Sequence, residues 1–433
     1  MRVSVVLFWL GQACGWSAPV TFTRDIAPIL YRRCISCHRA GEVAPFPLVS
    51  YADAAKRAPL IAQVTANRFM PPWKPEPRYG DFEGGRGLTQ AEIDTIQRWT
   101  KAGAPQGNLV DLPPMPVIDS GGLAHPDLTV RMPKAFTIPA DGPDLYRCFV
   151  IPLPLSADRY VDAIEFRPGN PRVLHHALFF VDRSRVARKK ENEPGGGYEC
   201  FGAPGFLPGA GLGGWSPGSP PIRMPQGVSA TLSKQSDLVL QLHFHPTGRT
   251  ETEQSTVAFS FTDQPPRRRL LDIPLGSRTI EIPAGEKAYR VTDTFTTPVD
   301  VEAIGIIPHA HFICKDMKGR ARLPDGSTRW LIWIKDWDFN WQEHYRYRQP
   351  IHLPEGTRLE MEFTYDNSAG NPRNPSHPPR RVQWGPDSTD EMAGLHVQVL
   401  ASRESDAAEL GQALWGKMMR TVGGGFFTLP EKR

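Results

Sequence analysis

Apolar residues recur with helical spacing in two short stretches near the N-terminus. Residues 25–31 have the apolar pattern of a short helix. A second helix is predicted after Thr89, because Thr89 and Glu92 form a capping box and Gly103 supplies a stop signal. We therefore expect a small helical domain at the start of the chain.

From Leu128 onward the pattern changes to short runs rich in Val, Ile and Phe, separated by Gly, Pro and Asp. Residues 160–166 and 359–365 are examples of such runs. Regularly spaced short strands of this kind are typical of β-sandwiches. The proline pair after Gln264 makes a boundary between two sandwiches of similar size, which we expect to be of the jelly-roll type.

Histidines are grouped along the strand-rich part of the chain, in the pairs His175-His176, His243-Phe244-His245 and His309-Ala310-His311. Alternation along a strand places His243 and His245 on the face opposite to a row of leucines, and places His309 beside His311 on one face. Two imidazoles side by side can chelate one metal ion. The adjacent pair would point to opposite faces of a regular strand, so its joint ligation requires a bulge or different ring nitrogens.

A Cys-x-x-Cys-His motif follows the first predicted helix, at Cys34, Cys37 and His38. At this spacing two thiols can form thioethers to haem vinyl groups while the histidine ligates iron. The alternatives are a redox dithiol or half of a zinc site, although the next cysteine is Cys148, far from the motif. Met70 lies in a Pro-rich loop where its thioether can be the second axial ligand, or it fills the core.

The chain of 433 residues is long enough for two or three domains. Its net charge of +4 does not favour a nucleic-acid partner. Met1 and Arg2 precede a short apolar run of signal-peptide length, so we expect an exported, periplasmic or secreted bacterial protein with no transmembrane segment after cleavage. Cys14 leaves a lipoprotein open, but Gly11 occupies the usual lipobox leucine position.

The order of the histidine motifs resembles the type II copper, ascorbate-dependent monooxygenases, the family of peptidylglycine and dopamine hydroxylases. That family has a His-His pair, a Leu-Gln-x-His strand, a His-x-His strand and a methionine shortly after an acidic pair. The matching positions span roughly Leu128 to the C-terminus and comprise His175, His176, His243, His309, His311 and Met392. The resemblance implies two copper ions: an electron-delivering copper held by the first three residues and an oxygen-activating copper held by the last three.

The N-terminal helices and the haem motif resemble those of a small cytochrome c. The expected fold class is therefore multidomain, with an N-terminal all-α cytochrome c-like domain followed by two all-β sandwich domains. The expected divisions are a signal peptide at 1–18, a haem domain at 19–108, a Pro-rich linker at 109–127, and copper monooxygenase sandwiches at 128–265 and 266–433.

The two resemblances together imply an oxidoreductase that hydroxylates a C–H bond of an organic substrate with dioxygen, using two coppers and a covalent haem c. Electrons would come from ascorbate or a redox protein, and the fused haem suggests that they pass through it. The alternative is a non-catalytic electron-transfer or copper-sensing protein. The resemblance also implies a disulfide between Cys148 and Cys200, which leaves Cys314 unpaired.

Three positions depart from the family pattern. Peptide-hydroxylating members have an arginine two residues before the His-x-His motif and a tyrosine four residues after the ligand methionine, both contacting substrate. Here these positions are Ile307 and His396, so a peptide carboxylate has no cationic anchor. His245 has no counterpart in the family and is a surrogate ligand, a proton relay or a surface residue.

Overall fold

A computed structural model describes residues 19–40, 42, 44–116, 122–191, 196–200, 204–206, 211–217, 219–225, 227–385 and 387–422. The predicted signal peptide at 1–18, including Cys14, lies outside these residues. The chain separates into two compact units, one comprising residues 1–71 and 86–117, the other residues 72–85 and 118–433. In the described part of the chain, no helix is both long and apolar enough to span a membrane.

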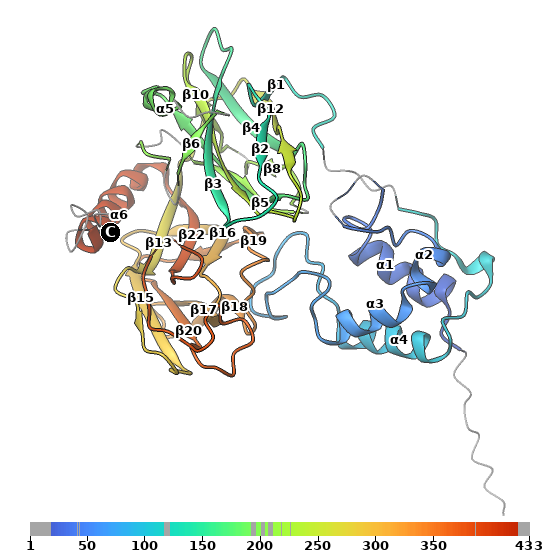
Figure 1. The fold of residues 1–433 in the computed structure, drawn as a ribbon. Helices are drawn as coiled ribbons and strands as arrows, with labels where there is room; N and C mark the ends of the chain where they lie inside the picture. Colours follow the sequence, from blue (N-terminus) through green and yellow to red (C-terminus); the bar gives the residue numbers. More distant parts are fainter. Residues whose placement is uncertain are drawn as a thin grey trace, which may run out of the picture. The chain divides into compact units, whose positions relative to one another are not determined.

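The first unit contains short helices around an apolar cluster that includes Ile26, Leu30, Ile96 and Trp99. The predicted capping box is present, because the Thr89 side chain accepts from the Glu92 N–H while the Glu92 side chain accepts from the Thr89 N–H. The elements are a π-helical turn η1 (Phe22–Ile26), α1 (Ala27–Arg33), α2 (Tyr51–Ala55), α3 (Ala58–Ala66), α4 (Gln90–Lys101) and a 3₁₀ turn η2 (Leu109–Asp111) (Figure 1).

The first part of the second unit is an N-terminal sandwich of two antiparallel sheets (Figure 1). One sheet has the order β1-β12-β4-β8, with β9 also paired to β4, and the other has the order β6-β3-β10-β5-β7. The elements are β1 (Leu128–Arg131), β2 (Phe136–Ile138), β3 (Leu145–Pro152), β4 (Arg159–Arg167), β5 (Leu174–Asp182), α5 (Val186–Lys190), β6 (Tyr198–Glu199), β7 (Gly211–Trp215), β8 (Ile222–Arg223), β9 (Ala230–Leu232), β10 (Asp237–Phe244), β11 (Glu251–Glu253) and β12 (Thr256–Thr262).

A C-terminal sandwich follows, with four-stranded sheets β13-β22-β16-β19 and β15-β20-β17-β18. The apolar faces of these sheets form one core, which also receives Phe82. The elements are β13 (Leu270–Ser277), β14 (Glu281–Ile282), β15 (Tyr289–Thr296), β16 (Val301–His309), β17 (Cys314–Arg322), β18 (Thr328–Ile334), β19 (Tyr345–Leu353), β20 (Arg358–Tyr365), β21 (Val382–Gln383), β22 (Ala393–Ala401), η3 (Glu404–Asp406) and α6 (Ala407–Val422).

The predicted fold class is wrong. The molecule is mostly β-sheet, with 36% of residues in strands, 17% in helices and only six short α-helices among the described residues. The range 19–108 is not an all-α domain, because residues 72–85 leave the helical unit and Phe82 forms a β-bridge with Tyr347 of β19. The capping and periodicity signals identified individual helices. Individual helices do not establish that the whole range is an all-α domain.

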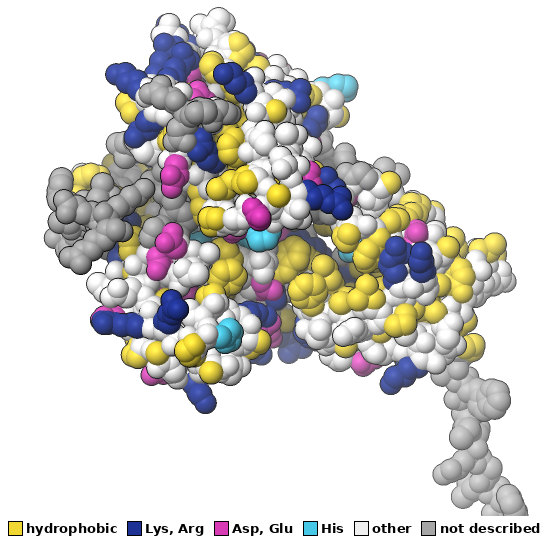
Figure 2. Space-filling view, viewed as in Figure 1, with side chains coloured by type: hydrophobic (Ala, Val, Ile, Leu, Met, Phe, Trp, Pro, Cys, Tyr) yellow, Lys and Arg dark blue, Asp and Glu magenta, His cyan; other side chains and the backbone are white. Residues whose placement is uncertain are grey.

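The predicted disulfide between Cys148 and Cys200 is present. It joins β3 to the segment after β6 and lies in a separate apolar cluster with Val150 and Val239. Val239 of β10 packs in this cluster, whereas Leu238, Leu240, Leu242 and Phe244 face the main sandwich core, and every residue of β10 is buried. Basic and acidic side chains are interspersed on the face of the second unit that Figure 2 shows.

Candidate metal centre

Three histidines from neighbouring strands converge at one end of the N-terminal sandwich. His243 on β10 lies opposite His176 on β5, while the next residue, Phe244, pairs with Leu174. His175 is therefore the extra residue of a bulge. This is the irregularity that the adjacent histidine pair requires if both rings are to reach the same point.

The ring nitrogens of these histidines face one another. The Nδ1 atoms of His175 and His176 are 3.1 Å apart, and those of His176 and His243 are 3.4 Å apart. One ligand atom from each of the three residues lies within 4.8 Å of the others. Several imidazole nitrogens aimed at one point provide the lone pairs that a metal ion needs. His175 Nε2 is buried and has no hydrogen-bond partner within the described residues.

Asp144 orients the buried member of this cluster. Its carboxylate lies 2.7 Å from His243 Nε2 and 2.8 Å from His245 Nδ1. A carboxylate only accepts, so a neutral His243 carries its proton on Nε2 and directs the lone pair of Nδ1 toward the other two histidines. Burial is the largest single effect and opposes ionisation of Asp144, but the hydrogen bonds and charges of His243 and His245 together outweigh it and lower the pKa of this carboxyl. The ring of Tyr146 stacks on His243 at a centroid distance of 4.1 Å.

Burial favours the neutral form of His175 and His176. Desolvation, with the nearby positive charge of other histidines, lowers the pKa of His175 to about 3 and the pKa of His176 well below its ordinary value. Neutral imidazoles are the form that binds metal ions. The three residues therefore fit a metal ion in geometry, and His175 and His176 also fit it in protonation.

The second predicted ligand pair lies in the C-terminal sandwich, at the end of β16. The rings of His309 and His311 are 5.3 Å apart and nearly perpendicular. His309 Nδ1 lies 2.6 Å from Gln342 Oε1, and His311 Nδ1 lies 3.2 Å from the Asp390 carbonyl oxygen. Both Nδ1 atoms therefore donate, which leaves both Nε2 atoms with lone pairs. Burial lowers the pKa of His309, and lowers the pKa of His311 to about 3.

Glu391 ties the third predicted ligand of this site, Met392, to His311. The Glu391 carboxylate is buried and accepts backbone N–H groups from His311, Ile313 and Met392. The register of β16 and β22 also places Met392 near these histidines, because His309 on β16 pairs with Gly394 on β22, two residues after Met392. The backbone of Met392 is therefore held beside the strand end that carries both histidines. Burial raises the pKa of Glu391 to about 8, against the opposing effect of the N–H donors.

Phe339, in the segment between β18 and β19, contacts both histidine clusters. Its ring stacks on His175 at 5.7 Å and lies edge-on to His311 at 5.5 Å. It also packs against Phe312. No periodicity or motif marks Phe339 or Asp144, because each acts on histidines that are distant in sequence. Glu391 belongs to the acidic pair of the motif, but its contacts with three backbone N–H groups could be found only from the folded structure.

In the helical unit the haem motif forms a turn at the C-terminal end of α1. The N–H of His38 donates to the Cys34 carbonyl at 2.9 Å. His38 Nδ1 lies 2.9 Å from the Phe46 carbonyl oxygen, so Nδ1 donates and Nε2 is available as a ligand. Burial lowers the pKa of His38, which favours the neutral ring.

Met70, the predicted second axial ligand, follows α3 and is partly exposed, with its N–H donating to the Val64 carbonyl.

Burial raises the pKa of the Cys34 thiol to about 12. A redox dithiol needs a readily formed thiolate, so this shift does not favour the dithiol interpretation of the motif.

The departures from the family pattern also have defined surroundings. His396 lies on β22 opposite Ile307 and is 2.6 Å from the Asp272 carboxylate. Burial opposes its protonation, but the charge and hydrogen bond of Asp272 raise the pKa of His396. His245 is exposed and held by Asp144, whereas Cys314 is buried with its thiol near the Thr364 carbonyl.

The comparisons with known proteins do not assign the chain to a family. No family model matches the sequence, and no curated protein matches it. Among solved structures, the chain is similar to the major capsid protein P2 of bacteriophage PM2, with 9% identity, a TM-score of 0.27 and coverage of 63% of this chain and 97% of that one. It is also similar to PNGF-II, with 9% identity, a TM-score of 0.25 and coverage of 64% and 66%. These weak likenesses assign no activity.

Proposed function

We propose that this protein is a copper-dependent monooxygenase that hydroxylates a C–H bond with dioxygen and receives electrons through a covalently attached c-type haem. The observation that carries the proposal is the convergence of the imidazole nitrogens of His175, His176 and His243. The His309 and His311 pair, with Met392 tied beside it, supplies a second donor set. Two imidazoles with a thioether favour Cu(I), and three imidazoles suit copper in either oxidation state.

Bound at these positions, copper would supply the one-electron and dioxygen chemistry that amino-acid side chains lack. The chain itself orients the ligands. Asp144 directs His243 Nδ1 toward its neighbours, and Gln342 leaves His309 Nε2 free to bind. The Glu391 carboxylate fixes the backbone of His311 relative to that of Met392. Burial favours the neutral, ligating form of His175 and His311.

The haem part of the proposal rests on the motif turn. Cys34 and Cys37 would form the thioethers, and His38 Nε2 would ligate iron while its Nδ1–H is held by the Phe46 carbonyl. Met70 would be the second axial ligand. The chain would act in the periplasm or outside the cell, with ascorbate or a redox protein as the external donor and a small organic molecule as substrate. Ile307 disfavours a peptide carboxylate, because it offers no positive charge.

Metal analysis and an optical spectrum provide the test, on protein made in a periplasm with haem-attachment machinery. We expect one haem and about two coppers per chain, falling to about one copper in Met392→Ala. Met115→Ala is the matched control, because Met115 is 45% exposed and lies outside both donor sets. Haem without stoichiometric copper would refute the monooxygenase.

Oxygen uptake separates catalysis from the alternative of a non-catalytic electron-transfer or copper-sensing protein. An enzyme consumes dioxygen only when a C–H substrate is present and yields the hydroxylated product. If a loaded protein exchanges electrons but yields no such product with any substrate tried, the non-catalytic alternative is favoured instead.

A further inference from the structure

Residues 72–85, which we call the strap, are built into the C-terminal sandwich. Phe82 forms a β-bridge with Tyr347 and is buried in the sandwich core. The Glu83 N–H donates to the Arg346 carbonyl at 2.9 Å, and the Glu76 N–H donates to the Trp333 carbonyl at 2.7 Å. Backbone pairing of this kind at both ends fixes the strap to the sheet.

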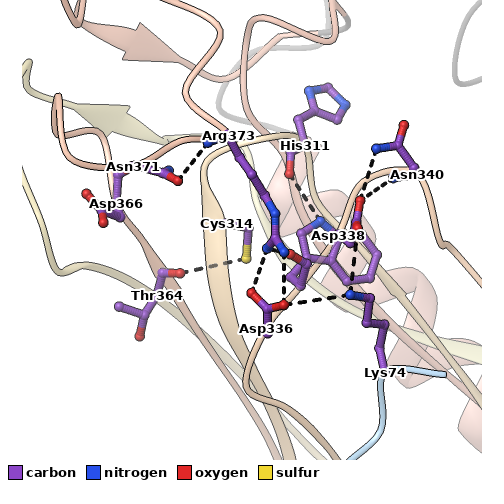
Figure 3. A network of polar contacts seen from close by, with 11 residues as sticks. Lys74, His311, Cys314, Asp336, Asp338, Asn340, Thr364, Asp366, Asn371 and Arg373 are labelled. Atoms are coloured by element: carbon purple, nitrogen blue, oxygen red, sulfur yellow. Dashed lines mark hydrogen bonds and ion pairs between the residues drawn. The ribbon is translucent and has the colours of Figure 1, made fainter. Parts of the chain in front are cut away.

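Lys74 of the strap is inserted between two acidic residues of the segment that follows β18. Its Nζ atom lies 3.7 Å from Asp336 and 3.6 Å from Asp338, and its side chain is only 6% exposed. Figure 3 shows Lys74 reaching these carboxylates, with Arg373 binding Asp336 from the other side. A buried cation without partners would be costly, so the position of Lys74 depends on this acidic segment.

The same acidic segment contacts both histidine clusters. Trp337, between the two aspartates, donates its Nε1–H to the His311 carbonyl at 3.1 Å. Phe339, directly after Asp338, stacks on His175 and packs against the ring of His311. From Lys74, one ion pair and one peptide link therefore lead to a side chain that contacts a ligand of each proposed copper.

We propose that the strap and the segment 336–339 form the electron route from the haem to the two histidine clusters. This inference rests on the proposed function. Met70, the predicted axial ligand, is joined through two prolines to Trp73 and Lys74, so the route begins on the covalent chain beside the haem ligand. It continues through the Lys74–Asp338 ion pair to Phe339 and from there to His175 or His311.

The redox balance is simple. For each electron carried, a haem iron held by His38 would be oxidised from ferrous to ferric, and a copper ion held at a histidine cluster would be reduced from Cu(II) to Cu(I). No covalent bond forms or breaks, and no proton needs to move. The external donor then reduces the iron again.

Flash reduction of the fully oxidised, copper-loaded full-length protein tests the route. A photogenerated flavin semiquinone reduces the haem, and haem absorbance then reports its reoxidation. We expect a reoxidation phase whose rate does not depend on protein concentration and which is missing in copper-free protein. Lys74→Gln and Phe339→Leu should each slow this phase severalfold. Lys335→Gln should not, because Lys335, although it directly precedes Asp336, is 50% exposed and pairs with Glu76 of the strap, outside the proposed sequence of Lys74, Asp338 and Phe339.

Haem and copper content and near-ultraviolet circular dichroism are measured on every sample, so that loss of metal or of fold is not taken for a slower rate. Absence of haem or of copper from the wild type overturns the proposed function together with the route. With both present, an unchanged rate in Lys74→Gln and Phe339→Leu overturns the route alone. A rate that rises with protein concentration also overturns it, because the electron then passes between molecules.

Discussion

The Nε2 atom of His243 lies 2.7 Å from the carboxylate of Asp144, a residue that precedes β3 and is 99 positions earlier in the chain. Because β3 and β10 are paired neighbours, the residue before one strand lies beside the end of the other. The contact turns a buried histidine so that Nδ1 points at two further imidazoles. It makes Asp144 a positioning residue for the three-histidine cluster.

Replacing Asp144 with Asn should weaken copper binding at this cluster by roughly 10–100-fold, the usual effect of losing an outer-shell partner of a metal-binding histidine. The physical reason is that His243 loses the charged acceptor that selects its tautomer. Competition titration with a copper chelator measures the change. His245→Gln is the control, since His245 also contacts Asp144 but is 69% exposed and outside the cluster. Equal losses in the two variants would contradict the positioning role.

The histidine clusters show how far the sequence carries a site prediction. Alternation along strands placed His309 beside His311, and the adjacent His175 and His176 required a bulge, which the register contains. The partners of these histidines could not be found in the same way. Asp144, Gln342 and Phe339 are joined to them only by strand order, and local periodicity carries no information on which strands become neighbours.

Acid should destabilise the metal-free protein through its buried histidines. Burial lowers the pKa of His175 and of His311 to about 3, whereas an unfolded histidine titrates near about 6.5. Below the unfolded value, the unfolded chain binds protons that the folded protein does not. The contribution of these two histidines to stability is therefore complete above about pH 6.5 and declines as the pH falls toward 3.

His311→Gln should show a shallower decline, because one of the depressed groups is removed. Urea unfolding midpoints between pH 7 and 4 measure this, with His377→Gln as the control at an exposed position. If the curve of His311→Gln ran parallel to that of the wild type, burial of this ring would not be the cause.

Loss of the Cys148–Cys200 disulfide should cost about 2–5 kcal/mol of unfolding free energy, the usual range for a native disulfide. The bond ties β3, a neighbour of β10, to the segment after β6. We expect Cys148→Ser, Cys200→Ser and the double variant to lose similar amounts in denaturant unfolding. A double variant much less stable than either single one would mean that the cysteines act separately. Cys314→Ser controls for replacing a buried cysteine that forms no disulfide.

The error in the predicted fold class also has a physical origin. Turn and capping signals report what a segment does within about one helical turn, and they identified α4 with its capping box. Such local signals do not indicate that the Pro-rich loop between α3 and α4 pairs with strand β19 of the C-terminal sandwich. The strap is held by Phe82 in a core built from strands far along the chain, so its docking depends on tertiary packing that no local pattern encodes.

Gly80 should be indispensable for that docking. Its φ of +123° is a conformation that favours glycine, and an added Cβ would collide with the Phe82 ring and lie 2.9 Å from the Leu331 carbonyl oxygen. Gly80→Ala should therefore detach the strap and expose the bond after Arg78 to trypsin, as mass spectrometry of limited digests would show. Gly84→Ala is the matched control, because Gly84 also has a positive φ, +64°, but its Cβ would meet nothing within 4 Å.

The control should lose only about 1–2 kcal/mol, the cost of a left-handed alanine, and keep the strap protected. Equal digestion of the two variants would mean that backbone strain, and not the contact with Phe82, decides whether the strap stays on the sheet. If Gly80→Ala digested like the wild type, Phe82 could shift without releasing the strap. The anchoring would then rest on the backbone hydrogen bonds at Glu76 and Glu83 and on the ion pairs of Lys74.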